Sequence, residues 1–202
     1  MLEYIETTWT QYINTGFIPD QDTRVVMTYI FPSVAPAGAP LGAYGFLFGA
    51  RKNANGSDSS QTFSAVYSTD GTFRSDYSRL YDITSLTSDF YDQKLTIDQN
   101  KETVKLYNEQ NEYLVDYVHT KKYFQSEVTM YFPAAHTGNG LTAVAPLKII
   151  DFKIYDNGIL VRDYIPVRQI SDGAIGMFDK VTQTFYGNAG TGSFIAGPVV
   201  GE

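Results

Sequence analysis

The chain has 202 residues, contains no cysteine and carries a formal net charge of −7. A disulfide framework, a cysteine nucleophile and a cysteine-based zinc site are therefore excluded. The acidic balance disfavours nucleic acid as a partner, and the longest apolar runs are too short for membrane insertion. The 16 Tyr and 13 Phe residues, against 4 Met and 1 Trp, are typical of sheets rather than helices.

Short runs of alternating apolar and polar residues recur along the chain and predict β-strands. They cover residues 23–31, 44–50, 61–67, 94–98, 103–107, 112–118, 128–132, 147–155 and 159–165. Within 147–155, we expect Ile150, Phe152 and Ile154 to share the buried face. The best helical candidate is residues 80–87, and residues 32–43 and 52–60 are expected to be loops.

Turn residues separate these runs. Asn157-Gly158 lies between two of them, and this dipeptide favours a type I′ hairpin because both central residues need positive φ. Asp70-Gly71 and residues 108–111 predict further hairpins. The pattern predicts an all-β, two-sheet antiparallel β-sandwich of the jelly-roll kind, with residues 1–202 forming a single domain.

Both ends of the chain carry a family resemblance. Residues 2–27 and 152–198 resemble concanavalin A-like, laminin-G-like sandwich domains of phage tail proteins and gut-bacterial surface proteins. Trp9 stands where that pattern has glycine, and Asn14 where aspartate is usual. The matching residues are Tyr4, Ile5, Gln11, Tyr12, Ile13, Thr15, Gly16, Pro19, Phe152, Tyr155, Gly158, Arg162, Asp163, Pro166, Arg168, Gly176, Asp179, Tyr186, Gly190, Gly192 and Phe194.

The resemblance implies a lectin-like sandwich in which the N- and C-terminal strands pair. It also implies a carbohydrate-recognition or adhesion module in a virion or at the cell surface. Its partners would be a glycan or bacterial surface polysaccharide, other virion or surface proteins, or further copies in a homo-oligomer. A purely structural or protein-binding domain is the alternative. No signal peptide is visible at Met1.

An enzyme is not expected. Glucanases that share this fold use Glu-x-Asp-x-x-Glu on one strand, and none of the seven glutamates begins that motif. The sequence also lacks a Gly-x-Ser-x-Gly nucleophile elbow. His119, at a strand end, is interpreted as a surface side chain. A glycan hydrolase or lyase with carboxylates on separate strands stays open.

Candidate ligand contacts are polar and aromatic side chains on strands. Arg51, Arg74, Asp76 and Tyr77 could bind the hydroxyl groups and the apolar face of a sugar. Alternation puts Arg74 and Asp76 on one face and Tyr77 on the other, and an ion pair that stabilises the sheet is the simpler explanation of the charges.

Two further loops and one aromatic residue complete the candidates. His136 and Asn139 lie in an expected flexible loop and could contact a ligand. Trp9 is either a core residue or a sugar platform. We expect no cofactor other than a possible calcium ion, for which Asp20 and Asp22 offer hard oxygens. Asp-rich segments of this kind are also common turns.

Overall fold

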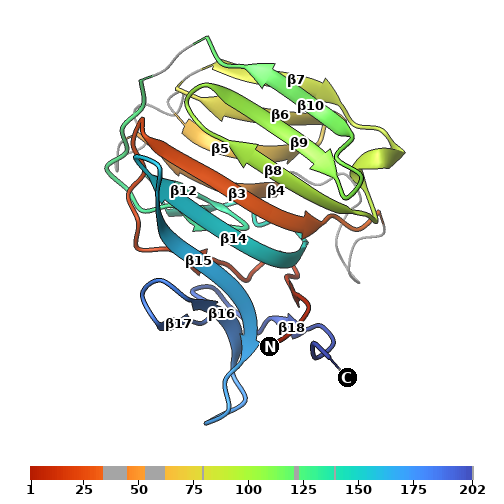
Figure 1. The fold of residues 1–202 in the computed structure, drawn as a ribbon, viewed down its shortest axis with the longest axis vertical. Helices are drawn as coiled ribbons and strands as arrows, with labels where there is room; N and C mark the ends of the chain where they lie inside the picture. Colours follow the sequence, from red (N-terminus) through yellow and green to blue (C-terminus); the bar gives the residue numbers. More distant parts are fainter. Residues whose placement is uncertain (34–44, 53–61, 79, 121–122, 139, 202) are drawn as a thin grey trace.

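The structure is a computed structural model that describes residues 1–33, 45–52, 62–78, 80–120, 123–138 and 140–201. Two β-sheets lie face to face and enclose one hydrophobic core (Figure 1). In the part of the chain that the structure describes, the paired strands are antiparallel except β4 and β12, which pair in parallel. The all-β, two-sheet sandwich predicted from the sequence is therefore confirmed.

The larger sheet has ten strands. Its order is β10-β9-β8-β3-β14-β15-β16-β17, and β1 joins β14 to β18 beside this path. The strands are β1 (Ile5–Glu6), β3 (Thr23–Ile30), β8 (Lys94–Gln99), β9 (Thr103–Asn108), β10 (Tyr113–Val118), β14 (Lys148–Asp156), β15 (Ile159–Arg168), β16 (Ile175–Asp179), β17 (Thr184–Tyr186) and β18 (Ile195–Ala196).

The smaller sheet has eight strands in the order β13-β12-β4-β5-β6-β7, with β2 and β11 beside β4. They are β2 (Ile13–Asn14), β4 (Gly45–Arg51), β5 (Thr62–Ser68), β6 (Thr72–Tyr77), β7 (Leu80–Ser85), β11 (Tyr131–Phe132), β12 (Ala135–Thr137) and β13 (Gly140–Thr142). A short 3-10 helix spans Ser88–Phe90 and leads from this sheet to the larger one.

The core consists of the inward side chains of both sheets, and aromatic rings fill much of it. Phe132 stacks on Phe152 with ring centroids 4.0 Å apart, which joins the two sheets. Phe48 meets Phe63 and Phe152 edge-on. Burial of one such side chain contributes about 1.5–3 kcal/mol, so the aromatic composition seen in the sequence serves mainly the core.

A β-bulge changes the expected pattern in β14. Ile149, Phe152 and Ile154 are fully buried, whereas Ile150 is only half-buried. The register against β3 shifts between Ile149 and Asp151, because one extra residue of β14 faces the ladder there. The prediction that Ile150 shares the buried face is therefore wrong. Alternation alone does not reveal an inserted residue.

The best helical candidate, residues 80–87, is not a helix in the structure. Leu80–Ser85 forms β7 and pairs with β6 along its whole length. The segment is rich in Ser, Thr and Asp, which have poor helix propensity, and the open edge of β6 offers hydrogen bonds instead. The expected strand at 128–132 is reduced to Tyr131–Phe132. Most of the two expected loops, 32–43 and 52–60, lies outside the described residues.

The two ends of the chain meet below the sandwich, beside β16 and β17 (Figure 1). Ile5 pairs with Ala196, and Leu2 forms a bridge to Val199. The structure thus pairs the N- and C-terminal strands. Among the described residues, no helix is long and apolar enough to cross a membrane.

Candidate functional site

Three turns meet at one end of the larger sheet. β8, β3 and β14 are adjacent and antiparallel, so the start of β3 lies beside the ends of both neighbours. The register places Val25 opposite Gln99 and Thr23 opposite Asp156. The turns at residues 20–23, 100–102 and 157–158 therefore share one rim of the sandwich.

Side chains of the turns themselves fix their backbones. Asp20 Oδ1 accepts a hydrogen bond from the Asp22 N–H at 2.9 Å, and Asn100 Oδ1 accepts one from the Glu102 N–H at 2.7 Å. Asn157 and Gly158 have φ of 47° and 79°. These two positive values confirm the predicted Asn-Gly turn, and they agree with the type I′ form. The rim is thus preformed.

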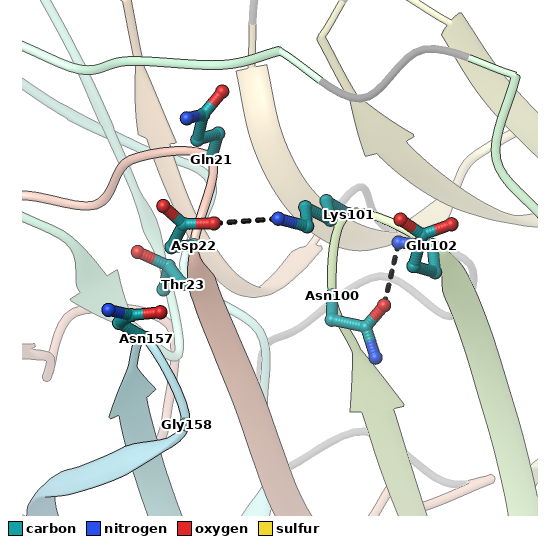
Figure 2. A pocket seen from close by; sticks show the side chains of 8 residues that line it. All are labelled: Gln21, Asp22, Thr23, Asn100, Lys101, Glu102, Asn157 and Gly158. Carbon is teal, nitrogen blue, oxygen red and sulfur yellow. Dashed lines mark hydrogen bonds and ion pairs between the residues drawn. The ribbon is translucent and has the colours of Figure 1, made fainter.

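Between the turns lies a hollow of about 220 Å³, which we call the rim hollow (Figure 2). Its lining residues come from all three turns, and all of them except Gly158 carry polar or charged side chains. Among the described residues, the side-chain amides of Gln21 and Asn157 have no hydrogen-bond partner, so both are available to a ligand. The lining residues are Gln21, Asp22, Thr23, Asn100, Lys101, Glu102, Asn157 and Gly158.

An ion pair crosses the rim hollow. Lys101 Nζ lies 2.7 Å from Asp22 Oδ1, and both side chains are partly exposed. The hydrogen bond and the charge of Asp22 raise the pKa of Lys101 above its ordinary value. At this degree of exposure the pair contributes little to stability. Its clearer effect is to hold the turn at 100–102 against the turn at 20–23.

Tyr77 supports this rim from inside the sandwich. It is fully buried, and its hydroxyl donates to the Gln21 carbonyl oxygen at 3.2 Å. Burial raises the pKa of Tyr77, and the negative charges of Asp22, Asp20 and Glu102 raise it further. The expectation that Tyr77 contacts a ligand is wrong, because its alternation in β6 turns the ring into the core.

The structure places Arg74 and Asp76 on the outward face of β6, as the alternation predicted. Arg74 forms an ion pair with Asp70, and its Nε donates to Thr72 Oγ1 at 3.1 Å. The register sets Asp76 opposite Ser64 of β5, whose side chain is 1% exposed. β4 and β5 are buried along their length apart from the half-buried Arg51, so among the described residues these two strands expose no open groove.

Arg51 ends β4 and is half-buried, opposite Thr62 of β5. Among the described residues, its Nε has no hydrogen-bond partner. Arg51 and β6 belong to the smaller sheet, and Arg51, Arg74 and Asp76 are not among the residues that line the rim hollow. Ligand binding by Arg51, Arg74 and Asp76 stays a prediction.

The two histidines differ from the expectations. His136 lies in β12, not in a flexible loop, and stacks on Tyr131 with centroids 4.3 Å apart. Burial lowers the pKa of His136, opposed by a hydrogen bond of 2.9 Å between Nδ1 and the Thr129 carbonyl oxygen. His119 is 4% exposed and stacks on Tyr77, so the prediction of a surface side chain is wrong. Asn139 lies outside the described residues.

The calcium candidates belong to the rim. The Asp20 carboxylate serves its own turn, and Asp22 pairs with Lys101. In the part of the chain that the structure describes, no three His, Asp or Glu side chains are grouped so that they could hold a metal ion. Calcium binding at Asp20 and Asp22 stays a prediction.

Trp9 is half-buried and belongs to none of the clusters of buried core residues. Its φ of 79° is unusual for a bulky side chain, and the family pattern has glycine at this position. The core alternative for Trp9 is therefore wrong. A role as sugar platform stays a prediction.

Comparisons with known proteins identify no family for this chain. No family model matches the chain, and no curated protein matches it. A solved structure of SCP-B, a member of the eqolisin family of peptidases in complex with the tripeptide Ala-Ile-His, is similar at a TM-score of 0.36 and 12% identity. The similarity covers 84% of this chain and 90% of that chain. At this level it carries no argument about activity.

The sequence alone indicates parts of the rim hollow but not the site. Asp22 is a predicted calcium ligand and Asn157 a predicted turn residue, whereas Gln21, Asn100 and Lys101 are not among the predicted site residues. The available signal was that polar turns follow or precede three of the predicted strands. That signal becomes a site only when the order of strands in the sheet is known.

Proposed function

We propose that the protein is a noncatalytic recognition module that binds a saccharide in the rim hollow. The observation that carries this proposal is the convergence of planar amide and carboxylate side chains from three turns on one small polar hollow. A side-chain amide offers both donors and an acceptor, so it can form complementary hydrogen bonds with two neighbouring hydroxyl groups of a sugar. Planar polar groups around a hollow are suited to such hydrogen bonds.

The size of the hollow limits the ligand. Pockets for drug-sized molecules measure about 300–1,000 Å³, and the rim hollow measures about 220 Å³. A single sugar unit at the end or the branch of a glycan fits this volume better than a long chain does. None of the described residues that line the hollow is aromatic, so binding relies on hydrogen bonds to hydroxyl groups.

The kind of contact that the rim hollow offers leads to weak binding at each site. Hydrogen bonds to hydroxyl groups replace hydrogen bonds to water, so each contributes about 0.5–1.5 kcal/mol. Preformed turns keep the entropic cost of binding low. Useful avidity then needs several copies, as on a virion or a cell surface. This agrees with the lectin-like family and the phage tail or bacterial surface location that the resemblance implies, and both belong to the proposal.

Two variants test the site. Gln21→Ala removes one free amide, and Asn157→Gly removes the other while keeping a residue that accepts positive φ. Gln110→Ala is the control, because Gln110 is exposed in the turn between β9 and β10, at the opposite end of the sheet. After a glycan array selects a saccharide, calorimetry should show affinity about fivefold to tenfold lower for each variant and unchanged for the control.

The proposal fails if no saccharide in the array binds the wild-type protein. It also fails if a saccharide binds and both variants retain full affinity, since the binding surface would then lie elsewhere. Release of shortened saccharides by the wild-type protein would favour a glycan hydrolase or lyase over a noncatalytic module.

A further inference from the structure

The hairpin formed by β15 and β16 extends away from the sandwich and carries an exposed apolar tip (Figure 1). Its turn is well fixed: Gln169 N–H donates to the Ala174 carbonyl oxygen at 2.8 Å, and Gly173 N–H donates to the Gln169 carbonyl oxygen at 3.0 Å. Ile170 in this turn is completely exposed. A rigid turn thus presents one isoleucine side chain to solvent.

A hollow of about 280 Å³ adjoins this tip. Gly173, Ala174 and Ile175 form the part of its lining that continues from the turn, and the C-terminal loop adds Ser193, Phe194 and two glycines. Asn188 also lines it, but its side-chain amide is used internally. Its oxygen accepts from Tyr12 and Gly190 N–H groups, and its nitrogen donates to Thr191 and Gly192 carbonyl oxygens. The hollow therefore suits an apolar side chain.

Charges of opposite sign stand on either side of the tip. Arg168 and Asp172 are both exposed, two residues before and two residues after Ile170. One oxygen of Asp172 accepts the Ala174 N–H at 2.9 Å, which leaves the other for a partner. A surface that carries a knob, a hollow and both charges is complementary to itself under a two-fold axis.

We propose that a second copy of this chain docks on this hairpin, so that the two copies form a two-fold dimer. Ile170 of each copy enters the hollow of the other, and Arg168 of each copy faces Asp172 of the other. Further exposed apolar residues at this end of the molecule extend the contact toward the size that a stable dimer needs. They are Met1, Ile195, Val199 and Val200.

Sedimentation velocity over a range of protein concentrations tests the proposal. The wild-type protein should self-associate to a dimer. Ile170→Asp should weaken this dimer by about thirtyfold or more, because a carboxylate would enter an apolar hollow. Val118→Asp is the control, since Val118 is 70% exposed but lies on β10 at the far edge of the sheet. Thermal melting of each variant checks that it is folded.

Charge reversal tests the two-fold arrangement itself. Arg168→Asp and Asp172→Arg should each weaken the dimer, because each places like charges opposite each other twice. An equal mixture of the two variants should form a heterodimer, in which both contacts again join opposite charges. A wild-type protein that stays monomeric, a dimer that withstands Ile170→Asp, or a mixture that does not associate would overturn the proposal.

Discussion

Asn157 and Gly158 show how single residues shape the rim. Their positive φ values let β14 reverse into β15 within two residues, and the Asn157 N–H also donates to the Asp22 carbonyl oxygen at 3.1 Å. The same two residues therefore close a hairpin and hold two of the three turns together. Stability and the geometry of the hollow depend on one dipeptide.

Substitution of Gly158 should be costly. Gly158→Val introduces a branched side chain at a φ of 79°, so the free energy of unfolding should fall by about 1–2 kcal/mol or more. Asn157→Gly should change it by only a few tenths of a kcal/mol, because glycine accepts the same conformation. Urea denaturation of both variants measures the difference. Equal stability of Gly158→Val and wild type would contradict the turn.

His136 should titrate below its ordinary range. Burial lowers its pKa, so the folded protein takes up this proton at lower pH than the unfolded chain does. The contribution to stability is therefore complete above about pH 6.5, the value for an unfolded histidine, and is lost as the pH falls through the folded-state pKa. NMR titration of the two histidine rings measures this. A His136 midpoint at or above 6.5 would refute it.

At the scale of elements, the sequence predicted the strands with clear alternation and the Asn-Gly hairpin. It failed where the deciding contact is distant in the chain. β7 forms because the edge of β6 is open, β12 takes His136 into a parallel ladder with β4, and Ile150 leaves the core at a bulge. No local pattern of residues encodes these pairings.

The rim hollow could not be predicted from the sequence either, because it also depends on contacts between residues that are distant in the chain. Each of its turns is recognisable from Asp, Asn and Gly alone, but their convergence depends on β3 lying between β8 and β14. Those strands are separated by dozens of residues in the sequence. Conversely, Tyr77 is a predicted ligand contact because it is aromatic and lies on a strand, but it shares a face of β6 with Phe73, and both rings are buried.

The N- and C-terminal segments pack so closely that there is no room for a side chain at Gly190. The Ala189 N–H donates to the Tyr12 carbonyl oxygen at 2.9 Å, and a Cβ on Gly190 would lie 1.9 Å from the Thr10 carbonyl oxygen. Gly190→Ala should therefore lower the free energy of unfolding by about 1–3 kcal/mol. Gly187→Ala, whose Cβ would make an ordinary contact of 3.6 Å, is the control. Calorimetric melting that ranks the two equally would argue against this packing.

At the scale of the whole molecule, we propose ligand binding at one end of the structure and dimerisation at the other. The sandwich core supports the rim hollow through Tyr77 at one end, and the opposite end carries the paired termini and the projecting hairpin. A dimer through that hairpin would present two rim hollows at once. Two weak sites on one particle would then act together on a surface that displays many copies of a glycan.

NMR mapping of the bound saccharide shows whether it occupies the rim hollow. When the wild-type protein is titrated with the saccharide selected on the array, amide shifts should concentrate at residues 20–23, 100–102 and 157–158. Amides of β6 around Arg74 and Asp76 should stay in place. Shifts that gather on the outward face of β6, or that leave the three turns unchanged, would contradict binding in the rim hollow.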